Sequence, residues 1–255
     1  MFIIPEKLLN EIKKVIPQKK YATGRPQSNI DNILNGIFYV IRNGNRWSDL
    51  PICYGPKSTV HGRFMELARN GIFEKILQVS IEFAIENLGV PECFFIDTTS
   101  SKAPFAKFGG KNPTDRGKNG IKKSVVIDKN RIILSIVLDA ANVHDSKLLK
   151  PHIKNLKPYL NTVKVMIADS AWDINSLRKS LAKDNLALLA ATNVRRDKNK
   201  KKFTPWGRWR IEQTFGIQQW NRGIKFCWTK TAEAFLALCQ FASAVQNFKL
   251  VGVFG

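Results

Sequence analysis

The sequence predicts an α/β protein in which a mixed, five-stranded sheet is flanked by helices and preceded by an all-helical region. Two observations support this prediction. Up to about residue 90, apolar residues recur at the 3.6-residue period of amphipathic helices. After Gly89, Val90 and Pro91, short apolar runs alternate with helical segments, an order that fits a sheet covered by helices.

Four helices are predicted before this boundary. The first covers residues 6–16, and the second begins at Ser28 and ends at Gly44. Two more follow at 59–69 and 72–84. Short helices joined by brief turns in a basic chain are typical of a helix-turn-helix-like DNA-binding module, and equally of a helical cap that packs on the main domain.

Five strands are predicted after the boundary. The runs 121–128 and 131–140 are separated by Lys129 and Asn130 and are typical of a hairpin. The other strands are 92–97, 163–169 and 186–191, and helices are predicted at 144–156, 173–185, 206–222 and 231–248. A loop rich in Lys, Gly and Pro covers residues 101–120.

The charge balance indicates a polyanionic partner. The 255 residues include 41 Lys and Arg against 20 Asp and Glu, a formal net charge of +21. A membrane surface is a weaker candidate, because the apolar run 234–245 is too short to span a bilayer and the stretch 1–14 lacks the basic start expected of a signal peptide. The four cysteines form no CxxC motif, so we expect no structural zinc and a reducing, cytoplasmic location.

Three carboxylates are the candidate catalytic residues. Asp97 and Asp169 each end an apolar strand, in FFIDTTS and MIADSAW, where α/β folds often bind ligands. Glu212 is the only acid in the basic, tryptophan-rich stretch 206–222. Taken alone, it also fits a surface ion pair with Arg208. Three carboxylates suit Mg²⁺ or Mn²⁺, and two such ions can act on a phosphodiester.

Seven motifs spread along the chain resemble one protein family. They are GRPQ (24–27), LNGIFYVIRNGNRWSDLP (34–51), FIDTTS (95–100), GGKNPTDRGKNGIKKSVVID (109–128), LDAANVHDSKLL (138–149), IADSAWD (167–173) and RWRIEQTFGIQQWNR (208–222). Together they resemble bacterial insertion-sequence transposases of the DDE class, in the branch of IS-five- and IS-four-like elements.

The resemblance implies a DNA transposase with a ribonuclease-H-like DDE catalytic domain at 91–255 and a helical, helix-turn-helix-like DNA-binding domain at 1–90. Asp97, Asp169 and Glu212 are then the catalytic residues and the ligands of two Mg²⁺ (or Mn²⁺) ions. Such an enzyme hydrolyses double-stranded DNA at the terminal inverted repeats of its element and joins the freed 3′-hydroxyl ends to target DNA. We expect a homodimer assembled on DNA, in the bacterial cytoplasm with the nucleoid.

The same stretch departs from the family in part. Relatives often have a tyrosine, arginine, glutamate and lysine signature across the glutamate helix. Arg208 matches the arginine, but Pro205 replaces the tyrosine and Gln219 replaces the lysine. Arg222, one turn later, is a candidate substitute for that lysine. These changes leave the three acids intact and concern how a terminal phosphate is bound.

Basic residues near the motifs are candidates for DNA contacts. They are Arg25, Arg63, Arg116, Lys118, Lys122, Lys123, Lys201, Lys202, Arg208, Arg210 and Arg222. Trp172 and Trp209 are candidates for stacking on DNA bases, although a tryptophan after a strand also fits the core. Two rival functions remain: a metal-dependent nuclease without strand transfer, and an inactive or domesticated DNA-binding protein.

Overall fold

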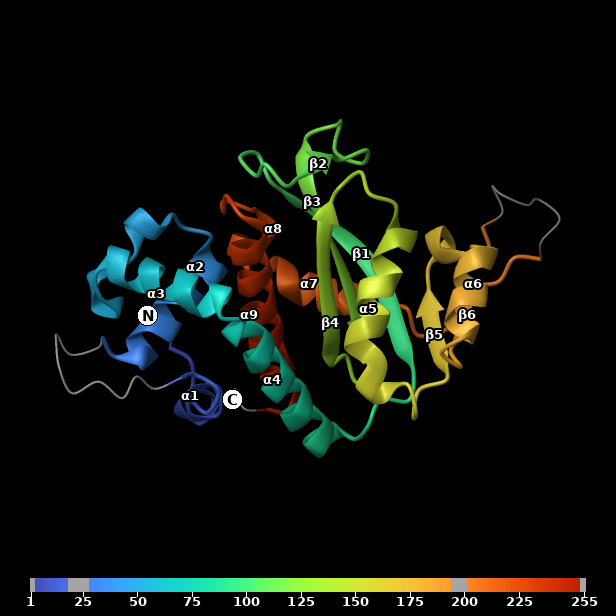
Figure 1. Cartoon of the computed structure of the whole chain (residues 1–255), viewed down its shortest axis with the longest axis horizontal. Coiled ribbons are helices and arrows are strands. Elements are labelled where there is room, and N and C mark those ends of the chain that lie inside the picture. The colour runs from blue at the N-terminus through green and yellow to red at the C-terminus, as the bar shows by residue number, and fades with distance from the viewer. Residues whose placement is uncertain (1–2, 18–27, 194–200, 253–255) are drawn as a thin grey trace.

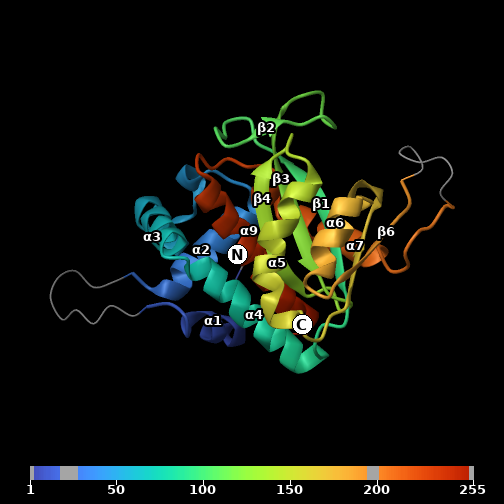
Figure 2. The same cartoon turned by 45° about the vertical axis from the view of Figure 1, so that its right-hand side comes forward.

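A computed structural model describes residues 3–17, 28–193 and 201–252. Figures 1 and 2 show the N-terminal helices at one end, the sheet in the middle, and β5, β6 and α6 at the other end. Helix α5 (Leu149–Leu156) lies in front of the sheet in Figure 1, and α7 (Trp209–Gln219) lies behind it. The sheet is therefore sandwiched between helices, as the sequence predicts.

The four N-terminal helices pack together, and the last three of them pack on the final helix of the chain. The four are α1 (Glu6–Lys13), α2 (Ile30–Asn43), α3 (Lys57–Arg69) and α4 (Ile72–Leu88), and the final helix is α9 (Ala232–Leu250). The rings of Phe38 and Phe73 contact the ring of Phe241 on α9, with centroids 6.4 and 5.5 Å apart. One apolar cluster thus runs from these helices into the C-terminal part. The domain boundary between residues 90 and 91 stays a prediction.

Helix α2 shows how local sequence sets its ends. It begins after Asn29, whose side chain accepts a hydrogen bond from the backbone N–H of Asp31, so the expected start at Ser28 is wrong by one residue. It ends at Gly44, where φ is +68°, a conformation that suits glycine. A side chain at Gly44 would also meet the Cβ of Arg222, at 2.9 Å.

The sheet is mixed and contains all five predicted strands. They are β1 (Phe94–Lys102), β3 (Asn119–Ile127), β4 (Ile133–Ala140), β5 (Val165–Ala168) and β6 (Ala187–Ala190). Their order is β4-β3-β1-β5-β6, with β3 antiparallel to both neighbours and β5 and β6 parallel to β1. A sixth strand, β2 (Gly110–Lys111), pairs with β3 inside the predicted loop.

The first strand is longer than its apolar run. The sequence predicts its end at Asp97, but β1 continues to Lys102, paired with β3 as far as Gly120. The prediction was wrong because it followed hydrophobicity, whereas β3 offers backbone partners along the polar stretch as well. Asp97 therefore lies within a strand, while Asp169 follows β5 directly, as predicted.

The predicted helix 206–222 is two helices. Gly207, with φ +88°, precedes α7, and the chain turns at Asn221 before α8 (Arg222–Lys225). Gly223 in α8 packs against α2 so closely that a Cβ there would lie 2.7 Å from the carbonyl oxygen of Val40. Helix α6 (Asn175–Ala182) covers β6. Within the described residues, no helix is long and apolar enough to cross a membrane.

Candidate active site

Two aspartates occupy matching positions on neighbouring parallel strands, Asp97 within β1 and Asp169 directly after β5. Strands β1 and β5 pair in register at Phe95 and Ile167, and Asp97 and Asp169 each follow that pair by two residues. The side chain of Asp97 is 18% exposed, and its Oδ1 accepts a hydrogen bond from the N–H of Thr98 (2.8 Å). The side chain of Asp169 accepts a hydrogen bond from the N–H of Ala171 (3.0 Å) and begins a short 3₁₀ turn.

Burial makes the Asp97 carboxylate hard to ionise. It raises the pKa of Asp97 to about 6, and the negative charge of Asp169 adds to the rise. Arg208 opposes the shift, because its Nη2 lies 3.4 Å from Oδ2 of Asp97. Asp97 and Asp169 carry two negative charges when ionised, and Arg208 supplies one positive charge. The site therefore favours the binding of a further cation.

Glu212 lies apart from the two aspartates. It is exposed in the first turn of α7, and its backbone N–H lies 3.5 Å from the carbonyl oxygen of Arg208, one turn earlier. Among residues 3–17, 28–193 and 201–252, no three His, Cys, Asp or Glu side chains are gathered closely enough to hold one metal ion. The metal-binding and catalytic roles of the three acids therefore stay predictions.

The chemistry of the two aspartates nevertheless fits a divalent cation. Both present carboxylate oxygens, the ligands that Mg²⁺ and Mn²⁺ prefer. The pKa of Asp97 is raised because burial disfavours its charged form, and a bound cation would stabilise that charged form. Asp97 and Asp169 would hold such an ion, and Glu212, four residues after Arg208 on α7, is the candidate third carboxylate.

Comparison with known families identifies the family of the chain. Residues 88–245, more than half of the chain and including all three acids, match the family model "Transposase DDE domain". The chain belongs to the DDE transposase family. Residues 4–77 match a second model, described as "Putative transposase of IS4/5 family". The resemblance to insertion-sequence DDE transposases is confirmed, and with the order of the strands so is the ribonuclease-H-like fold class.

Individual relatives are more distant. The chain is 30% identical over 140 residues to a protein of Burkholderia cepacia named "Putative transposase for insertion sequence element IS402". That match covers 51% of this chain and 64% of the relative's length. Among solved structures, a piggyBac transposase synaptic complex matches 96% of this chain and 70% of its own, with 12% identity and a TM-score of 0.48. A Drosophila P element transposase complex matches 95% and 63%, with 12% identity and a TM-score of 0.33.

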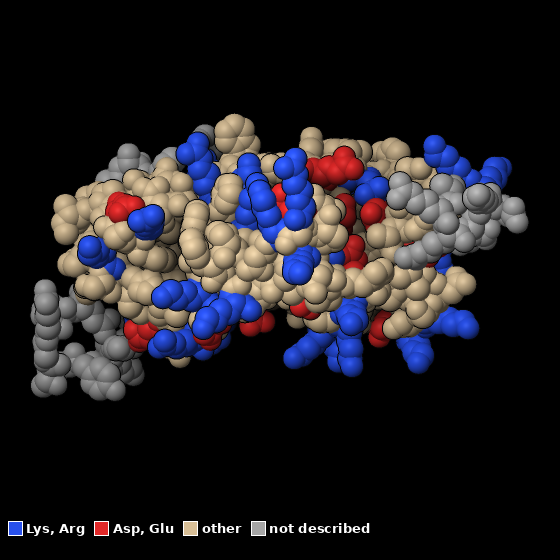
Figure 3. Space-filling model, turned by 90° about the horizontal axis from the view of Figure 1, so that it is seen from above, with Lys and Arg blue, Asp and Glu red and all other residues tan. Residues whose placement is uncertain are grey.

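Several basic residues proposed for DNA contacts are at the surface of this DDE transposase domain. Figure 3 looks down on the end of the molecule where β2 lies and shows Lys and Arg side chains over that face, with fewer acidic ones. The exposed candidates are Arg116, Lys118, Lys201, Lys202 and Arg222. Arg63 is paired with Glu66 (2.6 Å) and Lys122 with Asp145 (2.5 Å). Arg25 lies outside the described residues.

Lys123 and Trp172 are corrections to the sequence analysis. The Lys123 side chain is 4% exposed, because it points from β3 towards α8, where its Nζ donates to the carbonyl oxygen of Ile224 (2.9 Å). Burial also lowers the pKa of Lys123. Trp172 is 1% exposed. Neither side chain can contact DNA in this structure, and the core interpretation of Trp172 is the right one.

Arg210 contacts protein aromatics on several sides. Its guanidinium lies 4.6 Å from the ring centroids of both Trp206 and Trp209, and 5.7 Å from that of Phe95. Its Nε donates to the carbonyl oxygen of Lys129 (3.0 Å). The base-stacking candidate Trp209 is 47% exposed and already has this cation on its ring.

A polar hollow lies along the part of β1 that follows Asp97, and the sequence does not predict it. It has a volume of about 520 Å³ and is lined by Thr98, Thr99, Ser100 and Lys102 of β1, with Asn112–Asp115, Lys122, Ala141 and Asp145. The run of hydroxyl side chains directly after Asp97 was the available signal. It was overlooked because β1 was predicted to end at Asp97, which left these residues in an undefined loop.

Proposed function

We propose that this chain is the transposase of a bacterial insertion sequence. It binds double-stranded DNA at the terminal inverted repeats of the element, cleaves the DNA at the element ends, and joins the 3′-hydroxyl ends to target DNA. The observation that supports this most is the pair Asp97 and Asp169 on adjoining parallel strands, with a raised pKa for Asp97, in a chain of the DDE family.

Asp97, Asp169 and Glu212 are the proposed ligands of two Mg²⁺ or Mn²⁺ ions. When bound, such ions neutralise charge that develops on a phosphodiester and activate the attacking oxygen. The chain itself supplies ionised carboxylates above about pH 6, since that is where Asp97 loses its proton. The side chain of Asp97 is 18% exposed, so a metal ion can reach its carboxylate from solvent.

The residues around the three acids would position the DNA. Arg208 can exchange its hydrogen bond to Asp97 for a phosphate oxygen, since a guanidinium binds phosphate strongly. The hollow along β1 offers Lys102 and the hydroxyls of Thr98 and Ser100 to the DNA backbone. Phosphoryl transfer depends on such positioning and charge neutralisation, and needs no nucleophile from the protein.

Residues 1–90 are the proposed DNA-binding domain, and two copies of the chain would assemble on a pair of element ends. Within the glutamate helix, Gln219 is exposed in the last turn of α7 and Arg222 begins α8. Arg222 is the proposed substitute for the family lysine at the terminal phosphate. Its exposed side chain makes this role accessible.

The decisive experiment uses the DNA that flanks the coding sequence. A duplex ending in the flanking inverted repeat is incubated with the full chain and Mg²⁺, and cleaved and joined products are separated on a denaturing gel. Wild-type protein gives both products, and Asp169→Asn and Glu212→Gln give neither while retaining binding to the duplex. Asp184→Asn, in the turn after α6, is the matched control and behaves as wild type.

The rivals give different results in the same assay. A nuclease on this core yields cleaved but no joined products, and a domesticated DNA-binding protein yields a bound complex and no cleavage. If Asp169→Asn cut DNA at the wild-type rate, the catalytic assignment would be wrong.

A further inference from the structure

Three aromatic side chains, two of them exposed and one partly buried, form a cluster that the proposed chemistry does not use. Phe105 and Trp228 have ring centroids 5.8 Å apart, and Phe226 and Trp228 are stacked at 6.4 Å with an interplanar angle of 20°. Phe105 is 67% exposed and Trp228 is 49% exposed. We call Phe105, Phe226 and Trp228 the aromatic platform.

The platform lies at the end of β1. The segment after α8 pairs with the last residue of β1, where the N–H of Cys227 donates to the carbonyl oxygen of Lys102 (2.7 Å). Alternation along this extended segment places Phe226 and Trp228 on the same side. Figure 1 shows the loop after β1 beside the segment that leads into α9. The platform is therefore fixed to β1 by backbone pairing.

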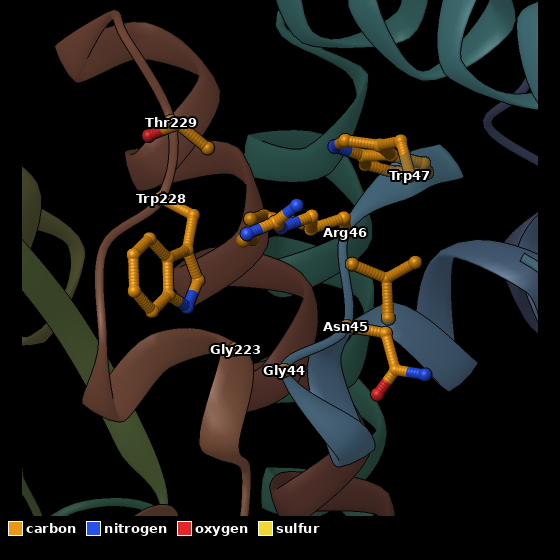
Figure 4. A pocket seen from close by; sticks show the side chains of 9 residues that line it. Gly44, Asn45, Arg46, Trp47, Gly223, Trp228 and Thr229 are labelled. Carbon is orange, nitrogen blue, oxygen red and sulfur yellow. The ribbon is translucent and has the colours of Figure 1, made fainter. Parts of the chain in front are cut away.

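A hollow adjoins the platform on the side of the N-terminal helices. It has a volume of about 150 Å³, and its lining includes Trp228, Thr229, Arg46 and Trp47. In Figure 4 the side chain of Arg46 extends from the segment after α2 towards Trp228. A flat group that stacks on Trp228 would thus find an arginine at its edge.

The charge around the platform indicates which kind of molecule binds to it. The Nζ of Lys102 lies 6.0 Å from the ring centroid of Phe226, and Arg46 is exposed beside the hollow. Together with the net charge of +21, these cations favour a polyanion over another protein. Exposed aromatic rings interleaved with cations are the combination that binds single-stranded nucleic acid, because every base has a face that can stack.

The partner must be an unpaired base. In an intact duplex both faces of each base are covered by its neighbours, so an aromatic side chain reaches a base face only after the base leaves the stack. Lys102 is five residues beyond Asp97 on β1, a distance of about 17 Å along an extended strand. Because Phe226 pairs with Lys102, the platform lies within the length of a few nucleotides from Asp97.

We infer that the platform stacks an unpaired base of the DNA strand close to the cleaved bond. This inference rests on the proposed function for its substrate, but it concerns residues outside the acid site. It assigns to Trp228 and Phe105 the role that the sequence analysis gave to Trp172, which the core excludes.

Binding of the full chain to a short fluorescein-labelled single strand, and to the same sequence as a duplex, tests the inference by fluorescence polarisation. Trp228→Ala and Phe105→Ala weaken single-strand binding by about fivefold to a hundredfold. Duplex affinity and the slope of log affinity against log salt stay as in the wild type, since no phosphate contact is lost. Trp228→Phe retains most of the single-strand affinity.

Trp220→Ala is the matched control, because Trp220 is 72% exposed at the end of α7. It leaves single-strand binding unchanged. Thermal unfolding checks that each variant folds. Because Phe105 is exposed, Phe105→Ala tests the platform even if Trp228→Ala fails to fold. Wild-type single-strand affinity in both alanine variants, or an equal loss for the duplex, overturns the inference.

The two proposals fail in different ways. If the wild-type chain cleaves and joins DNA but the platform variants bind single strands normally, only the platform is wrong. If the wild-type chain neither cleaves nor joins DNA but Trp228→Ala weakens single-strand binding, the platform stands and the transposase proposal fails.

Discussion

Arg208 places a cation directly on the buried carboxylate of Asp97, with 3.4 Å between Nη2 and Oδ2. Glu212 lies four residues after Arg208, so the two side chains leave α7 on the same face. Helix α7 therefore begins beside the cation that pairs with Asp97 and carries, one turn later, the acid proposed to join Asp97 around a metal. The pairing suggests that Arg208 neutralises Asp97 until DNA and metal bind.

Replacing Asp97 by asparagine should stabilise the fold at neutral pH while abolishing cleavage. Burial raises the pKa of Asp97 from 3.8 to about 6, so the folded protein holds this proton more tightly than the unfolded chain. Its contribution to stability is complete below pH 3.8 and is lost as the pH rises through about 6. The shift corresponds to at most about 3 kcal/mol, and solvent screening reduces it to roughly 1–2 kcal/mol.

Urea unfolding of Asp97→Asn and wild type at pH 8 and pH 4 measures this effect. The variant should be more stable at pH 8, and the difference should shrink towards pH 4. The same substitution at Asp184, in the turn after α6, serves as the control. A gain in stability that did not change with pH would contradict the ionisation argument.

Removing the Arg208 cation should make Asp97 harder to ionise. Arg208 lowers the pKa of Asp97 against the effect of burial, so Arg208→Gln raises that pKa further. The acid limb of the pH–rate profile for DNA cleavage should move to higher pH, and the maximal rate should fall on the order of a hundredfold. Arg131→Gln tests specificity, because Arg131 also reaches α7, through Gln213 (2.9 Å), but is not paired with Asp97. An unshifted acid limb in Arg208→Gln would count against this coupling.

The sequence was most informative where a local rule sets the structure. Gly44 ends α2 because its left-handed backbone favours glycine, and the strands 121–128 and 131–140 form the hairpin that their turn and composition predict. Asp169 follows its strand as expected, because that strand is short and apolar. The candidate acids could be named from such patterns, together with the family resemblance.

Tertiary contacts determine which side chains are buried at positions where the local sequence does not show it. Lys123 and Lys122 are neighbours on β3, yet the alternation of the strand buries the first under α8 and leaves the second at a hollow. No local pattern shows which face α8 covers. Likewise, the role of Arg210 depends on Phe95 and Trp206, which converge on it only in the fold.

Arg210 should contribute to stability and not to DNA binding. Its guanidinium lies against Trp206, Trp209 and Phe95, so Arg210→Met should destabilise the protein by about 1–3 kcal/mol, through lost cation–π contacts and the hydrogen bond to Lys129. The dependence of duplex binding on salt should not change. For Arg222→Met we expect the opposite. Its free energy of unfolding should change little, and the slope of log duplex affinity against log salt should be lower by about one. Urea unfolding and salt titrations of both variants separate the two roles, and a reduced slope for Arg210→Met would restore it as a DNA contact.

Lys123 should be replaceable by an apolar side chain. Its ammonium group is buried at the carbonyl oxygen of Ile224, which also accepts a hydrogen bond from the hydroxyl of Ser101 (2.7 Å). Lys123→Met fills a similar volume and leaves that oxygen one partner, so stability should change by less than about 2 kcal/mol in either direction. Because Lys123 is 4% exposed, duplex affinity and its salt dependence should match the wild type. Lys202→Met, at an exposed position after β6, should reduce the salt slope in the same titration, and an equal reduction in Lys123→Met would show that DNA reaches this lysine after all.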